Sequence, residues 1–153
     1  MNRRDLLTVG ATTAVANALW LAQSCGAQGT GSTTPHPPAS GGDAIDALIR
    51  AATECATTCE TCLARSIEHA ASGMSEMAAC ARLSRECAEL CRAVIVLATA
   101  GSTRLPELAR ICAAACDDCA AQCQHHASME PACAHCAEVC PRCAEACRAV
   151  ATS

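Results

Sequence analysis

Cysteine recurs at alternating steps of three and four residues along the chain, and this spacing constrains the fold more than any other feature. Over residues 112–123 the steps are four, three and four, and over residues 133–147 they are three, four, three and four. Residues 55–62 and 80–91 carry shorter versions of the pattern, with Ser84 at a skipped step. An α-helix completes a turn every 3.6 residues, so each set falls on one helical stripe, at the core positions of a heptad. The spacing predicts helices whose thiols face a common axis.

Glycine, serine and proline divide the sequence into four helical stretches. We expect helices over residues 43–73, 75–101, 102–127 and 128–150, with Asp43 and Ser128 as N-terminal caps and Pro106 in the first turn of the third helix. No window shows the period-two alternation of a strand. Helices joined by connections of a few residues pack as antiparallel neighbours. The predicted fold class is all-α, an antiparallel up-down-up-down four-helix bundle with a cysteine-lined core.

The composition predicts a thin hydrocarbon core. The 153 residues include sixteen cysteines but no Phe or Tyr, and the single tryptophan is Trp20. Alanine and cysteine bury little apolar area each, at about 25 cal/mol per Å², so the domain needs another stabilising contribution. A net charge of −4 argues against nucleic-acid binding, which requires a basic face.

The N-terminal region has the composition of an export signal and a linker. Met1-Asn2-Arg3-Arg4 and the uncharged stretch that follows resemble a twin-arginine signal, assigned to residues 1–27. Cys25 as a lipidated residue is an alternative. Residues 28–42, rich in Gly, Ser, Thr and Pro, predict a flexible linker, and residues 43–153 the bundle domain. The apolar stretch is too short for a membrane span, so we expect an exported, periplasmic protein.

The cysteine stripes favour metal binding over disulfides. Neighbours three or four residues apart on a helix have Cβ atoms about 5–6 Å apart, beyond the roughly 3.5–4.5 Å of a disulfide. Bridges between helices remain an alternative, as does a zinc or iron-sulfur module. Thiolates are soft ligands suited to Cu(I), and a continuous stripe suits an ion that takes few thiolates and shares sulfurs with its neighbour. No acid and base flank a nucleophile, so we do not expect an enzyme.

The stripes also predict one open end and one closed end. Extended toward the connection between the first two helices, the same steps reach His69, Met77, His126 and Met129, which all carry Cu(I)-binding groups. The other end carries apolar residues, expected to plug the bundle: Ile45, Leu48, Ile49, Val94, Leu97, Leu105, Leu108, Ile111 and Val150. We therefore expect copper to enter at one end only. Pro141, inside the fourth helix, predicts a kink.

The twin-arginine leader, the small-residue linker and the cysteine-lined helices together resemble the exported branch of the copper storage protein family, over about Asp43 to Val150. The resemblance implies storage of multiple Cu(I) ions for buffering or for supply to copper enzymes, and a homotetramer of bundles. His69, Met77, His126 and Met129 carry over by analogy with the family's His and Met residues at the open end. The copper ligands it implies are Cys55, Cys59, Cys62, Cys80, Cys87, Cys91, Cys112, Cys116, Cys119, Cys123, Cys133, Cys136, Cys140, Cys143 and Cys147.

Overall fold

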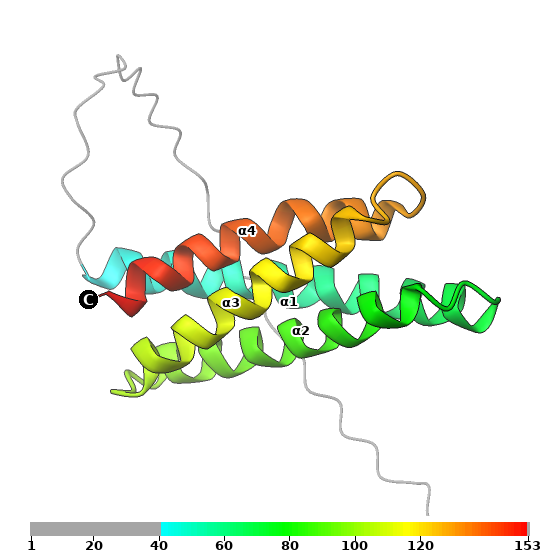
Figure 1. The fold of residues 1–153 in the computed structure, drawn as a ribbon. Helices are drawn as coiled ribbons and strands as arrows, with labels where there is room; N and C mark the ends of the chain where they lie inside the picture. The colour runs from blue at the N-terminus through cyan, green and yellow to red at the C-terminus, as the bar shows by residue number, and fades with distance from the viewer. Residues whose placement is uncertain (1–40, 153) are drawn as a thin grey trace, which may run out of the picture. The chain divides into compact units, whose positions relative to one another are not determined.

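The protein is described by a computed structural model that covers residues 41–152. It contains four α-helices, α1 (Gly41–Ala71), α2 (Met77–Thr99), α3 (Leu105–Gln124) and α4 (Pro131–Ala151), shown in Figure 1. No strand occurs in this range, so the predicted all-α fold class is confirmed. The proposed export signal, Cys25 and residues 28–40 of the proposed linker lie outside the described residues.

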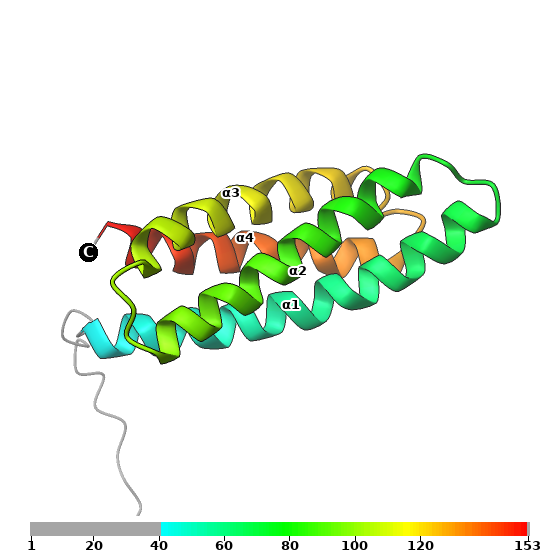
Figure 2. The same ribbon diagram turned by 90° about the horizontal axis from the view of Figure 1, so that it is seen from below.

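The helices form a closed ring in which each helix packs against two neighbours. α1 packs against α2 and α4, and α3 packs against the same two helices, while the diagonal pairs meet within residues 41–152 only through side chains at the axis. The α1–α2 and α3–α4 connections lie at one end, and the α2–α3 connection lies at the other end with the start of α1 and the end of α4 (Figures 1 and 2). This is the predicted up-down-up-down topology.

Glycine ends the first two helices as predicted. Gly73 has φ of 104° and Gly101 has φ of 60°, values that L side chains rarely adopt. α1 begins at Gly41, two residues before the expected cap Asp43. The connections α1–α2 and α2–α3 therefore fall where the sequence places them.

The start of α4 differs from the prediction. Glu130, not Ser128, is the N-cap, and its carboxylate accepts a hydrogen bond from the Ala132 backbone N–H at 3.0 Å. Pro131 follows as the first helical residue. The N–H at this position has no partner within a helix, so proline loses no hydrogen bond there. α3 also ends earlier, at Gln124, so residues 125–129 form a turn. α4 then continues through Pro141, whose side chain is exposed.

The core consists mainly of cysteine and alanine. All fifteen cysteines from Cys55 to Cys147 are fully buried, each at 0 % exposure, whereas the fully buried larger side chains include only Leu48, Met77, Val94 and Val139 among non-cysteine residues. The thin hydrocarbon core predicted from composition is therefore present. None of the described helices combines the length and the apolar character needed to cross a bilayer.

The closed end is apolar, with one correction. Leu48, Val94, Leu105 and Val150 are buried there, and the other predicted plug residues Ile45, Ile49, Leu97 and Leu108 are half-buried. Ile111 is not part of the plug, because its side chain is 52 % exposed. The adjacent Cys112 occupies the inward position of that helical turn, and one residue along a helix turns the side chain by about 100°.

Candidate metal centre

The fifteen buried thiols line the axis of the bundle as a continuous column. All are free, and neighbouring sulfurs from different helices lie 3.3–3.8 Å apart. All of them except Cys147 assemble into five groups of four, in each of which all sulfurs lie within 4.8 Å of one another. The groups are Cys62/Cys80/Cys123/Cys133, Cys59/Cys119/Cys136/Cys140, Cys55/Cys59/Cys87/Cys140, Cys55/Cys87/Cys91/Cys116 and Cys91/Cys112/Cys116/Cys143.

Four of the five groups are linked through shared cysteines. Cys59 and Cys140 join the second group to the third, Cys55 and Cys87 join the third to the fourth, and Cys91 and Cys116 join the fourth to the fifth. A sulfur that belongs to two groups can bridge two soft metal ions. The linked groups therefore form a ladder that several ions can occupy together.

The group at the open end, Cys62/Cys80/Cys123/Cys133, shares no sulfur with the other four groups. We call it the outer group. Two fully buried serines accompany it: Ser66 Oγ lies 3.9 Å from Cys62 Sγ, and Ser84 Oγ lies 3.7 Å from Cys119 Sγ in the neighbouring group. Both serines occupy stripe positions, Ser66 on the open-end side of the outer group and Ser84 on the ladder side, so a hydroxyl replaces a thiol on each side of the group.

Contacts between thiols lower the pKa of some cysteines and raise that of others, and burial raises it. Hydrogen bonding to Cys116, whose Sγ lies 3.5 Å away, lowers the pKa of Cys87 to about 6. Burial raises the pKa of Cys133, and the charges of Cys62 and Cys80 raise it further. A thiolate that accepts hydrogen bonds from neighbouring thiols is stabilised, whereas a desolvated thiolate is not. The column thus combines thiols that ionise readily with thiols that need a cation to do so.

Polar side chains close the open end above the outer group. Glu130 is buried, its Oε2 lies 2.6 Å from His69 Nε2, and Arg65 Nε is 3.5 Å from the same oxygen. The Ala132 N–H and then His69 hold the pKa of Glu130 below its usual value. Because Glu130 is a carboxylate at neutral pH, its Oε2 accepts this hydrogen bond and His69 Nε2 donates it.

His126 and Met77 are the buried candidate metal ligands at the open end. His126 is only 6 % exposed and follows the end of α3, with Nε2 3.4 Å from Gln122 Nε2. Its Nδ1 is buried without a hydrogen-bond partner, a costly arrangement unless the atom has a ligand at some stage. Met77 is 1 % exposed and opens α2 one turn from Cys80.

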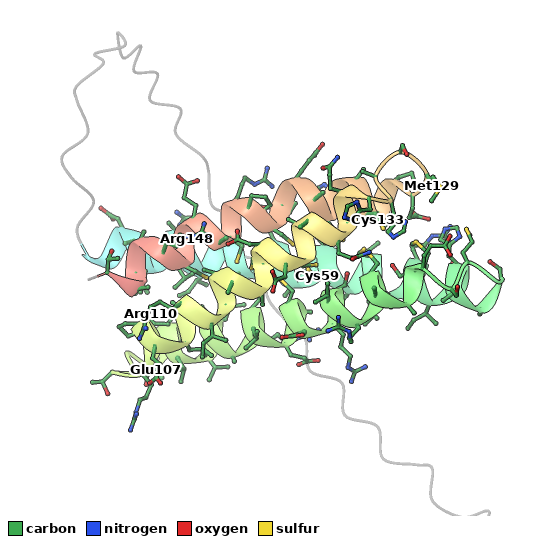
Figure 3. The ribbon with its side chains drawn as sticks, viewed as in Figure 1. Cys59, Glu107, Arg110, Met129, Cys133 and Arg148 are labelled. Atoms are coloured by element: carbon green, nitrogen blue, oxygen red, sulfur yellow. The ribbon has the colours of Figure 1, made fainter. Side chains whose placement is uncertain are left out.

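The expected position of Met129 on the fourth helix is wrong. Met129 lies in the turn before α4, and its side chain is 61 % exposed (Figure 3). Glu130 was not identified from the sequence, although Pro131 is a signal for the first position of a helix and so for an N-cap at the residue before it. The open end therefore joins His69, Met77, His126 and Glu130, with Met129 on its rim.

Comparison of the chain with models of known protein families gives a match to one family. The family model described as copper storage protein matches residues 42–152. Comparison with the curated proteins returns no significant match.

Solved structures of the same kind match this chain. Apo copper storage protein 3 from Bacillus subtilis is 32 % identical, with 69 % of this chain and 97 % of that chain covered and a TM-score of 0.61. A Cu(I)-bound copper storage protein, BsCsp3, is 31 % identical over 71 % of this chain and 98 % of that chain, with a TM-score of 0.65. The copper storage protein Ccsp from Streptomyces lividans, loaded with 10 copper equivalents, is 25 % identical. The match covers 77 % of this chain and 93 % of that chain, with a TM-score of 0.67.

Proposed function

The chain belongs to the copper storage protein family, and on that basis we propose that it stores several Cu(I) ions on cysteine thiolates inside its four-helix bundle. The observation that carries the proposal is the column of fifteen buried, free thiols in mutual contact. Buried thiols this numerous contribute little hydrocarbon to the core, so their shared property is affinity for a soft ion. The role is storage, not catalysis.

Shared sulfurs favour Cu(I) over the alternatives for most of the column. A structural zinc site takes four ligands of its own, so adjacent groups that share cysteines do not all hold zinc at once. Disulfides require sulfurs about 2.05 Å apart, and the nearest pair among the described cysteines, Cys80 and Cys123, is separated by 3.3 Å. Cu(I) needs fewer thiolates per ion, so a ladder with common corners serves it well.

We assign all fifteen cysteines from Cys55 to Cys147 as copper ligands. Copper enters past His126, Met77 and His69, whose imidazoles and thioether bind Cu(I) more weakly than thiolates and pass it inward. Met129, exposed on the rim, serves as an outer contact for the arriving ion. The apolar plug around Leu48 and Val94 closes the opposite end.

The assignments outside the bundle rest on the N-terminal sequence and on the family. The twin-arginine residues Arg3 and Arg4 support export and a periplasmic location. A homotetramer of bundles, and a copper enzyme as recipient of the stored ions, extend the same proposal.

Cu(I) titration against a competing cuprous chelator tests the storage function. The anaerobic, reduced protein is expected to withdraw many copper equivalents per chain, and Ellman's reagent should then detect few of the fifteen described thiols. Uptake of only one or two equivalents would contradict storage, and few free thiols before copper is added would indicate disulfides.

The entry route is tested separately by replacing His126. We expect His126→Ala to slow Cu(I) loading several-fold in stopped-flow measurements without changing the final copper content. The matched control is His135→Ala, because His135 is an exposed residue of α4. Equal loading rates for wild type and both variants would refute the route past His126.

A further inference from the structure

The outer group differs in construction from the four groups of the ladder. Each helix contributes one of its cysteines: Cys62 from α1, Cys80 from α2, Cys123 from α3 and Cys133 from α4. In each of the other four groups one helix supplies two cysteines and another supplies none. Four donors on four separate helices surround a point from four directions, which is what a tetrahedral ion requires.

The sulfur distances of the outer group are close to those of a tetrahedron. Five of its six distances are 3.3–3.6 Å, and the sixth, between Cys123 and Cys133, is within 4.8 Å. A Zn–S bond of about 2.3 Å gives a tetrahedral S–S edge of about 3.8 Å. If the four sulfurs moved apart by a few tenths of an ångström, they could therefore bind the ion as a tetrahedron. The same movement would relieve the close contacts between the sulfurs.

The sulfur distances of the ladder groups suit zinc equally well, so the outer group is distinguished by its unshared sulfurs. In the Cys91/Cys112/Cys116/Cys143 group, the recorded contacts are 3.7 Å from Cys91 to each of Cys112 and Cys143. Its Cys91 and Cys116 also belong to the next group, so an ion placed there competes with a neighbour for sulfur. A four-thiolate ion with ligands of its own is thus best accommodated at the outer group.

Ser84, one turn after Cys80 on α2, interrupts the column between the outer group and the ladder, whereas Ser66, one turn after Cys62 on α1, lies on the open-end side of the outer group. Both are fully buried at stripe positions, where a cysteine would add a thiol to the column. A serine hydroxyl donates a hydrogen bond to a thiolate but does not bridge two soft ions as a thiolate does. Such hydroxyls lie near Cys62 on one side and Cys119 on the other, at 3.9 and 3.7 Å.

We propose that, before copper is loaded, Cys62, Cys80, Cys123 and Cys133 hold one divalent ion of the zinc class as a tetrathiolate, and that Cu(I) displaces this ion from the same thiols as the store fills. Four thiolates and one such ion leave a local charge of −2, which a hydrogen bond donated by the Ser66 hydroxyl to the Cys62 thiolate would offset in part. The site lies directly beneath the open end, so an ion there covers the ladder while copper is scarce. Binding of this ion does not depend on copper storage, whereas its displacement by Cu(I) rests on the proposed function.

Cobalt(II) is the probe, because it takes the tetrahedral sites of zinc and absorbs visible light. The full chain, reduced and without oxygen, is expected to bind one equivalent of Co(II) with the intense bands of a tetrathiolate, and one equivalent of Zn(II) should remove these bands. Cys62→Ser/Cys133→Ser should weaken Co(II) binding at least tenfold and abolish the tetrathiolate spectrum. The matched control Cys91→Ser/Cys143→Ser removes two thiols from the ladder. It should keep the wild-type Co(II) affinity and the tetrathiolate spectrum.

Each other outcome overturns the proposal. One is that the wild type shows no tetrathiolate spectrum, and another is that the outer-group variant keeps it. The third such outcome is that the control loses the spectrum while its helical content is intact. If the outer-group double variant loses its helical circular dichroism, the single variant Cys133→Ser, in the first turn of α4, is used in its place. It too should bind Co(II) at least tenfold more weakly than the wild type. A separate Cu(I) titration of each variant distinguishes failure of this site from failure of storage.

Discussion

Replacing Cys140 with serine tests whether the thiols act as a shared ladder. Cys140 Sγ lies 3.7 Å from both Cys55 and Cys59 and 3.6 Å from Cys136, and Cys140 is a corner of two of the five groups. A hydroxyl is a poor Cu(I) ligand, so Cys140→Ser should impair both groups at once. We expect the variant to lose about two of the ion positions that these five groups represent.

The matched control is Cys147→Ser on the same helix. Cys147 is also fully buried, two helical turns further along the same stripe, but it belongs to none of the five groups. Both variants bury a hydroxyl in place of a thiol, at a cost of about 1–3 kcal/mol in stability, so this penalty cancels in the comparison. Because both variants remove one copper ligand, the difference between them reports the effect of removing a sulfur that two groups share.

The assay is anaerobic Cu(I) loading, removal of loosely held copper by a cuprous chelator, and elemental analysis of copper per chain. Circular dichroism of the apo forms checks that both variants fold. Equal copper loss from the two variants would refute the idea that corner-sharing determines capacity. So would a larger loss from Cys147→Ser than from Cys140→Ser.

Four further predictions address stability, pH and the break in the column. Leu48→Ala, in the plug, should lower the apo protein's free energy of unfolding by about 2–5 kcal/mol in urea denaturation and leave copper content unchanged. Because the folded pKa of Glu130 is below 4.5, its carboxylate stabilises the fold above that pH and loses this effect as pH falls through the folded value. Glu130→Gln should thus cost about 1 kcal/mol at neutral pH and nothing in strong acid, again measured by urea denaturation. Ser84→Cys should join the outer group to the ladder, because Ser84 Oγ is 3.7 Å from Cys119 Sγ, and should raise copper uptake in the chelator titration. Cu(I) binding deprotonates thiols, so pH-stat titration should record proton release, and copper affinity should fall with pH.

The cysteine spacing was sufficient to predict the fold and the direction of every described thiol. Steps of three and four residues determine which side of a helix is buried without reference to any partner helix, so Cys112 and Cys133 were both predicted to face the axis. The glycines at 73 and 101 end helices through a local backbone preference, which is equally readable from the sequence.

The details that failed depend on contacts between helices. Ser128 and Glu130 are both acceptable caps by composition, and only the packing of Glu130 against His69 shows which one starts α4. That choice moved Met129 from a helical stripe into a turn. The grouping of sulfurs is also set by the relative heights of the helices, which spacing along one chain does not contain; Cys147 is therefore inward-facing yet outside all five groups.

The thin core and the metal column are two aspects of one design, because bulky hydrocarbon on the stripe would displace the ligands. The larger aliphatic residues Leu48 and Val94 are buried at the closed end, away from the outer group. An ion that binds between the thiols is therefore expected to add to the stability of the folded state. A ligand present at 100 times its dissociation constant and bound only by the folded state contributes about 2.7 kcal/mol per site, similar to a buried leucine. A few Cu(I) ions therefore replace several missing side chains, so the thermal stability of the bundle should rise stepwise with its copper content.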